Sequence, residues 1–246
     1  MGIMLDRKQL KREARASMRA AAPRTGWVTL VFVTILLILE MLSLKLEFPA
    51  TSLKEIFFSY VDLDEDALNR LLLAAGRQNF ISRLLGYAIS IMTMVLSVGY
   101  AGYALNVARN VPAGFGDLFD AFSILLKVLW LQILESIFIA LWSMLFIIPG
   151  IVAAYRYSMA VFILLDDPDK GAMQCIRESK EMTRGYKGKL FWLDMSFIGW
   201  WILCAIPFVG LYVLPYTTVA RANYYKVLSG RYDAPWVESG TGPDVF

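Results

Sequence analysis

Residues 141–165 read LWSMLFIIPGIVAAYRYSMAVFILL, and this stretch decides the architecture of the chain. Only Arg156 within it is charged, Pro149-Gly150 interrupts it, and an acidic cluster follows at residues 166–169. Taken with the apolar residues from 125 onward, the run is about twice the ~20 residues that one helix needs to cross a bilayer. The stretch therefore predicts two membrane spans joined by a turn at the Pro-Gly pair.

The composition of the whole chain agrees with a membrane protein. Of its 246 residues, 58% are hydrophobic and 18% are charged, whereas about a quarter of the residues of a soluble domain are charged. The net charge of +3 is too small to indicate a nucleic-acid partner. Histidine is absent and there are only two cysteines, which removes His-dependent triads and most zinc or haem sites. We expect no metal and no cofactor.

We predict an all-α fold with six spans in three hairpins, each hairpin preceded by an amphipathic helix at the membrane surface or in the cytoplasm. A weak repeat supports this plan, because KVLWLQ at 127–132 and KLFWLD at 189–194 each open a hairpin. Chance similarity between apolar runs is the competing explanation. The predicted spans are residues 27–44, 84–107, 127–148, 151–165, 190–206 and 208–228.

Basic residues predict the orientation of the spans, because cytoplasmic connections are rich in Lys and Arg. Residues 1–26 carry seven such residues, the connection 166–189 carries six, and the turns at Pro149-Gly150 and Pro207 carry none. Both termini are then cytoplasmic, the segment 45–82 is extracytoplasmic, and residues 229–246 form a flexible tail. Within the first segment, Leu10, Ala14 and Met18 recur at helical spacing among basic residues. This pattern predicts a helix on an anionic membrane surface, or simply cytoplasmic flanking sequence.

The second span contains a series of small residues. Such residues allow close approach between helices in lipid, so close packing is the expected role and a ligand passage the less favoured one. The series is Gly86, Ala88, Ser90, Ser97, Gly99, Ala101 and Gly102.

Charged side chains inside spans are costly and usually have partners. Asp194 and Arg221 are equally distant in sequence from the expected turn at Pro207, so they should lie at one depth and form an ion pair, either as a structural link or as a catalytic pair. Glu40 is the best-matched partner for Arg156. Glu135 has no obvious base and is the first candidate for a functional residue. The intramembrane candidates are therefore Glu40, Glu135, Arg156, Asp194 and Arg221.

A second set of polar residues lies in the predicted cytoplasmic connection. Clustered carboxylates are able to hold Mg²⁺ or Ca²⁺, and neighbouring bases are able to bind a lipid phosphate. An acidic helix start followed by a basic amphipathic helix explains the same residues without a ligand. No hydrolase or phosphate-loop motif accompanies them. The candidates are Asp166, Asp167, Asp169, Arg177, Ser179 and Lys180.

Four segments together resemble an uncharacterised bacterial family of integral membrane proteins, domain of unknown function 975. They are DRKQLKREAR at 6–15, the stretch 141–168, RESKEMTRGYKGKLFWLDMSFIGWW at 177–201 and VLPYTTVARANYY at 213–225. The hairpin and following helix also look, more loosely, like the membrane domain of some glycerophosphodiester phosphodiesterases. The family resemblance implies a multi-pass protein of the bacterial plasma membrane and supplies no catalytic residues.

Three functions remain open at this stage. The first is a non-enzymatic protein that binds membrane lipid, an anionic phospholipid above all, or supports a transporter or an envelope-lipid process. The second is a small oligomeric transporter or channel lined by Glu135, Arg156 and Asp194. The third is a lipid-headgroup enzyme that acts at the cytoplasmic face through Asp166, Asp167 and Asp169.

Overall fold

The computed structural model describes residues 2–3, 7–21, 24–47, 80–203, 209–230 and 239–240. It is all-α apart from a two-residue antiparallel pair between β1 (Gly2–Ile3) and β2 (Ser239–Gly240). Most of the expected extracytoplasmic segment 45–82, the expected turn at Pro207 and most of the tail 229–246 lie outside the described residues.

The chain divides into two compact units, and the smaller comprises Val31–Met94. Among its described residues are most of α2 (Thr25–Glu47) and the first half of α5 (Phe80–Ala108). Many apolar side chains on these helices are exposed, including Leu37, Ile38 and Leu84. Exposed apolar side chains at such density are typical of a surface that meets lipid or another protein.

The larger unit comprises Met1–Leu30 and Val95–Phe246. It contains the first residues of α2 and the second half of α5. Its other described helices are α1 (Arg7–Ala20), α6 (Asp117–Asp120), the 3₁₀ turn η1 (Ala121–Ile124), α7 (Leu125–Leu145), α8 (Ile147–Tyr157), α9 (Ala160–Asp166), α10 (Ala172–Met182), α11 (Lys187–Met195), α12 (Ile198–Leu203) and α13 (Gly210–Leu228).

Within the described residues, four helical stretches are long and apolar enough to cross a membrane, judged by length and composition. They overlap the first four predicted spans, which confirms the all-α membrane character of the chain. The fifth and sixth expected spans are not among them, so the count of six and the three-hairpin layout stay predictions. The four stretches are Thr25–Leu46, Phe80–Ala108, Asp117–Leu145 and Ile147–Asp166.

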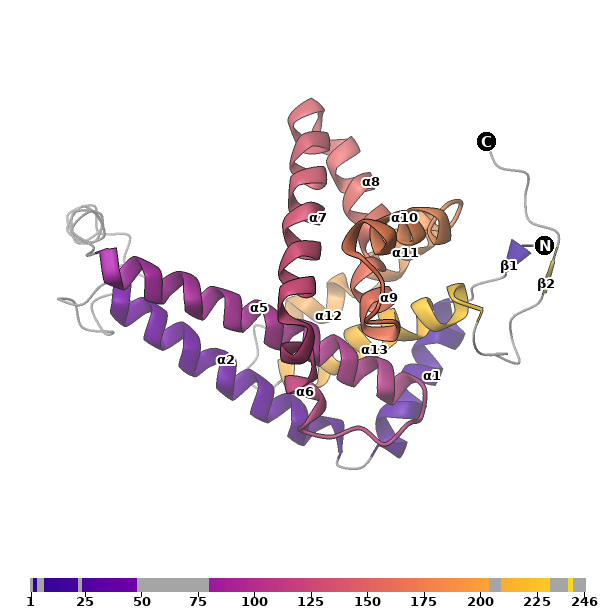
Figure 1. The fold of residues 1–246 in the computed structure, drawn as a ribbon. Coiled ribbons are helices and arrows are strands. Elements are labelled where there is room, and N and C mark those ends of the chain that lie inside the picture. Colours follow the sequence, from indigo (N-terminus) through magenta and orange to yellow (C-terminus); the bar gives the residue numbers. More distant parts are fainter. Residues whose placement is uncertain are drawn as a thin grey trace. The chain divides into compact units, whose positions relative to one another are not determined.

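Helices α7 and α8 form the expected central hairpin and run side by side (Figure 1). The chain reverses at Phe146, which is extended (φ −161°, ψ 154°), and not at the Pro-Gly pair. Pro149 lies in the first turn of α8, where a missing N–H costs nothing. Gly150 packs so closely against Ser143 that a Cβ there would overlap its side chain. The pair therefore starts a helix and allows close packing, and the expectation that it forms the turn is wrong.

Two of the expected spans are broken helices. The fourth bends at Ser158-Met159, between α8 and α9, and the fifth bends at Ser196-Phe197, between α11 and α12. A break frees backbone N–H and C=O groups, which cannot stay unbonded away from water. Side chains from other helices bind the freed groups at both places.

Helix α1 packs along α13. Its apolar stripe, Leu10, Ala14 and Met18, is buried there, so these side chains contact protein and not lipid. The remaining surface of α1 is strongly basic and exposed; its exposed cations are Arg7, Lys8, Arg12, Arg15 and Arg19.

Candidate functional site

The break between α8 and α9 is bonded by two hydroxyls, one from α10 and one from the residue that follows α10. Ser179 Oγ donates to the carbonyl of Arg156 at 2.9 Å and accepts from Met159 N–H at 3.2 Å. Thr183 Oγ1 reaches the same Arg156 carbonyl at 3.2 Å. Ser179 is fully buried and Thr183 is nearly so. Ser179 was expected to contact lipid or an ion, and its burial gives it a structural role in place of that one.

The break between α11 and α12 is bonded from α1. Lys11 Nζ donates to the Ser196 carbonyl at 3.1 Å and lies 4.2 Å from the centre of the Phe197 ring. Burial lowers the pKa of Lys11 from its usual value, with Arg15 and Arg7 as further causes. Part of the basic face of α1 is thus used to bind the protein itself.

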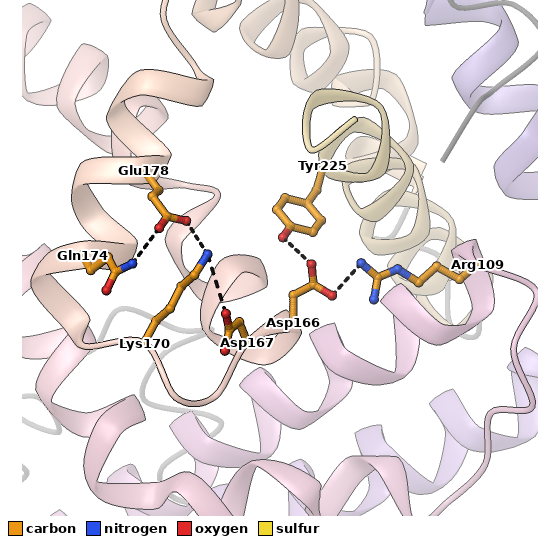
Figure 2. Close-up of polar contacts among 7 residues, drawn as sticks. All are labelled: Arg109, Asp166, Asp167, Lys170, Gln174, Glu178 and Tyr225. Atoms are coloured by element: carbon orange, nitrogen blue, oxygen red, sulfur yellow. Dashed lines mark hydrogen bonds and ion pairs between the residues drawn. The ribbon is translucent and has the colours of Figure 1, made fainter. Parts of the chain in front are cut away.

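Asp166 is tied to two other helices and does not stand open for a metal ion. Arg109 Nη2 lies 2.7 Å from one carboxylate oxygen, and the Tyr225 hydroxyl donates to the other at 2.9 Å (Figure 2). The Asp166 side chain is only 6% exposed. These contacts join the end of α9 to α5 and α13. Removing one partner of such a buried pair typically lowers the stability of the fold by several kcal/mol, so we interpret these contacts as a structural link.

A second polar cluster lies on the α10 side of the same turn (Figure 2). Lys170 Nζ bonds to Glu178 at 2.6 Å and lies 3.9 Å from Asp167, and Gln174 donates to the other Glu178 oxygen at 3.0 Å. The cluster fixes the start of α10. Within the described chain no group of three or more His, Cys, Asp or Glu side chains is placed to hold a metal ion. The remaining candidates, Asp169, Arg177 and Lys180, are exposed.

The predicted pair of Asp194 and Arg221 is confirmed. The guanidinium donates to both carboxylate oxygens, at 3.1 and 2.7 Å, and so bridges α11 and α13. The Arg221 side chain is 50% exposed, whereas that of Asp194 is 15% exposed. A two-point Arg–carboxylate contact fixes geometry as well as charge, which fits a link between helices.

The other intramembrane candidates do not come together. Glu135 lies on α7, and its Oε1 atom is buried without a hydrogen bond among the described residues. The Arg156 guanidinium lies 5.8 Å from the centre of the Trp142 ring, across the α7–α8 hairpin. Glu40 belongs to the other compact unit, so its pairing with Arg156 stays a prediction.

A basic cavity lies beside α1 that the sequence patterns did not reveal. It has a volume of about 620 Å³ and an open mouth. Arg15 and Arg19 of α1, Arg24 and the start of α2, and Leu211 and Tyr212 of α13 contribute to its lining. Positive charge in residues 1–26 was visible in the sequence, but only the packing of α1 on α13 brings residue 212 to it. This cavity and the basic face of α1 form the candidate site.

Comparison with known proteins finds one family match, in the C-terminal part of the chain. Residues 144–232 match the model of the family described as Protein of unknown function (DUF975). The resemblance is confirmed for this segment. The match covers somewhat over a third of the chain and includes α8 to α13. It therefore contains both broken helices, whereas Lys11 and Arg109, which bond to Ser196 and Asp166, lie outside it. No curated protein and no solved structure matches the chain. The looser similarity to phosphodiesterase membrane domains stays a prediction.

Proposed function

We propose that this is a non-enzymatic protein of the bacterial plasma membrane that binds anionic phospholipid at the cytoplasmic face, alone or in support of a transporter or an envelope-lipid process. The supporting observation is the way α1 is mounted. Because its apolar stripe is buried and α1 packs on α13, the rotation of α1 about its own axis is fixed, and its basic side chains other than Lys11 stay exposed. Each cation near an anionic membrane surface contributes about 1 kcal/mol of attraction.

The competing functions have less support. An ion or substrate path lined by Glu135, Arg156 and Asp194 is disfavoured because Asp194 is bonded to Arg221 and Arg156 lies against Trp142. A metal-dependent headgroup enzyme is disfavoured because both oxygens of Asp166 already bind protein groups. Lipid binding by α1 needs neither arrangement.

We propose that both termini are cytoplasmic. Any even number of spans, four or six, places both termini on the same side of the membrane. The contact of α1 with α13 supports four. If α13 crossed the bilayer, the arginines of α1 beside it would enter the hydrocarbon, at roughly 2.5–3.5 kcal/mol for each charge at the centre. If the chain from α10 onward stays on the cytoplasmic side, the same contact is made without this cost.

Labelling of single cysteines in intact cells decides the number of spans. A Cβ at Gly210 meets nothing within 4 Å, so Gly210→Cys is tolerated. We expect it to be protected from an external impermeant maleimide, as is the cytoplasmic control Gly188→Cys, while Lys45→Cys at the opposite end of α2 is labelled. Cys204 is replaced by serine throughout. Burial, with Glu178 nearby, raises the pKa of Cys175 to about 11, so this thiol stays unreactive. Labelling of Gly210→Cys from outside would establish the six-span arrangement.

Lipid selectivity tests the proposed function. The tested variant combines Arg7→Gln, Lys8→Gln and Arg12→Gln. These three residues are exposed on α1. In reconstituted protein, we expect the preference for spin-labelled phosphatidylglycerol over phosphatidylcholine to fall by up to about fivefold per charge at low salt, and less at 0.15 M, where charges are screened.

The matched control is Arg177→Gln with Lys180→Gln, which removes exposed charges from α10. This control should keep the preference. A loss in the control alone would move lipid binding to α10, and an unchanged preference in both variants would refute the proposed function.

A further inference from the structure

The cavity beside α1 is built from two kinds of surface. Three arginines, Arg15, Arg19 and Arg24, contribute to its lining, and no acidic residue lines it among the described residues. Apolar side chains, among them Met18, Leu30 and Leu211, line it as well. The volume of about 620 Å³ lies within the range of small-molecule sites, roughly 300–1,000 Å³. A lining that combines arginines with apolar side chains matches an amphiphile with an anionic head.

The position of the cavity points to a lipid. The start of α2, the first described helix long enough to cross a membrane, contributes to the cavity lining, and the exposed Trp27 is among these residues. Tryptophan at the end of a span is typical of the membrane interface. The N-terminal end of a helix favours negative charge, and at the start of α2 this adds to the effect of the three arginines. The head of a phospholipid lies at this depth, and its chains leave toward the hydrocarbon.

We propose that this cavity binds one anionic phospholipid per chain. The phosphate is held by the arginine forks, which match phosphate geometry, and the acyl chains lie along Met18, Leu30 and Leu211. The site rests on the proposed function, since it turns a general attraction for anionic lipid into a single stoichiometric site. A free phosphate ion would use the same arginines but would leave the apolar side chains uncovered.

The test is native mass spectrometry of the full chain, extracted gently and supplied with phosphatidylglycerol or phosphatidylcholine. The wild-type chain should retain one phosphatidylglycerol. In Arg19→Gln with Arg24→Gln, the apparent affinity for this lipid should fall about tenfold or more per arginine. Arg177→Gln with Lys180→Gln removes the same charge from the exposed surface of α10, outside the cavity, and should keep the bound lipid.

A second variant blocks the cavity without changing its charge. Gly26 lines the cavity, and a Cβ there meets nothing within 4 Å, so Gly26→Phe fills space and leaves the arginines in place. Its control is Gly188→Phe, also the second residue of a helix with open space around its Cβ. We expect the bound lipid to be lost only from Gly26→Phe.

The outcomes separate the two proposals. Retention of the lipid by both cavity variants would overturn the cavity site, while a selectivity that still depends on Arg7, Lys8 and Arg12 would leave the proposed function standing. Displacement of the lipid by millimolar inorganic phosphate, with no effect of Gly26→Phe, would show a phosphate-ion site and overturn the lipid assignment. Absence of any preference for phosphatidylglycerol in the wild-type chain would refute both.

Discussion

Ser179→Ala should destabilise the folded protein by about 2 to 4 kcal/mol, because it leaves two buried backbone groups without their side-chain partner. The hydroxyl accepts from Met159 N–H and donates to the Arg156 carbonyl, at a place where the α8–α9 break removes the regular helix bonds. Thermal unfolding in detergent, followed by tryptophan fluorescence, measures the loss. No exposed surface changes, since Ser179 is fully buried.

Two comparisons sharpen this prediction. Ser158→Ala removes a hydroxyl whose one bond among the described residues is to the Tyr155 carbonyl in its own turn, so this change should cost much less. Thr183 shares the Arg156 carbonyl with Ser179, so Ser179→Ala with Thr183→Ala should cost more than the sum of the single changes. Equal stability of Ser179→Ala and Ser158→Ala would show that the break does not depend on α10.

Prediction from the sequence succeeded where it depended on the length of an apolar run or on the equal spacing of two residues from a turn. The apolar runs around residues 27–44 and 84–107 are long enough that only helices of membrane-spanning length fit them. Asp194 and Arg221 were paired because they lie equally far from Pro207, and the structure confirms their contact. This pairing needed only the expectation that the last two stretches run back along each other.

Prediction from the sequence failed where a contact between distant segments, and not the local residue pattern, determines the structure. Pro149-Gly150 has the composition of a turn, yet proline is equally suited to the first turn of a helix, and the chain reverses three residues earlier at Phe146. The serine at 179 is polar and lies on a basic helix, which indicated a surface role. Its buried role depends on contacts with a helix break 20 to 23 residues earlier, which no pattern near residue 179 indicates.

For the same reason, the sequence predicted only part of the candidate site. The charges of α1 are evident from the sequence, and its amphipathic spacing predicted one buried face. Nothing local shows that the buried face meets α13, because Leu211 and Tyr212 are some 190 residues away in the chain. Arg109 likewise follows the second span as an ordinary flanking base, and only the fold brings it to Asp166.

Gly99→Ala should be among the most damaging single substitutions in this chain. A Cβ at Gly99 would overlap the backbone carbonyl of Leu118, and a backbone atom within α6 has no rotamer by which to move away. Overpacking of this kind typically costs about 1–3 kcal/mol and sometimes more. We expect a lower melting temperature in detergent and a larger share of aggregated protein in size-exclusion chromatography.

Gly102→Ala provides the control from the same helix. Its Cβ would meet only the side chain of Leu165, at 3.5 and 3.8 Å, which is ordinary contact. Because alanine is favoured over glycine in a helix by about 1 kcal/mol, this change should leave stability equal or slightly higher. The pair tests the meaning of the small residues in α5. If both variants are equally stable, the close packing of α6 against α5 at Gly99 is contradicted. If only Gly99→Ala loses stability, that glycine is needed for packing, whereas Gly102 is replaceable.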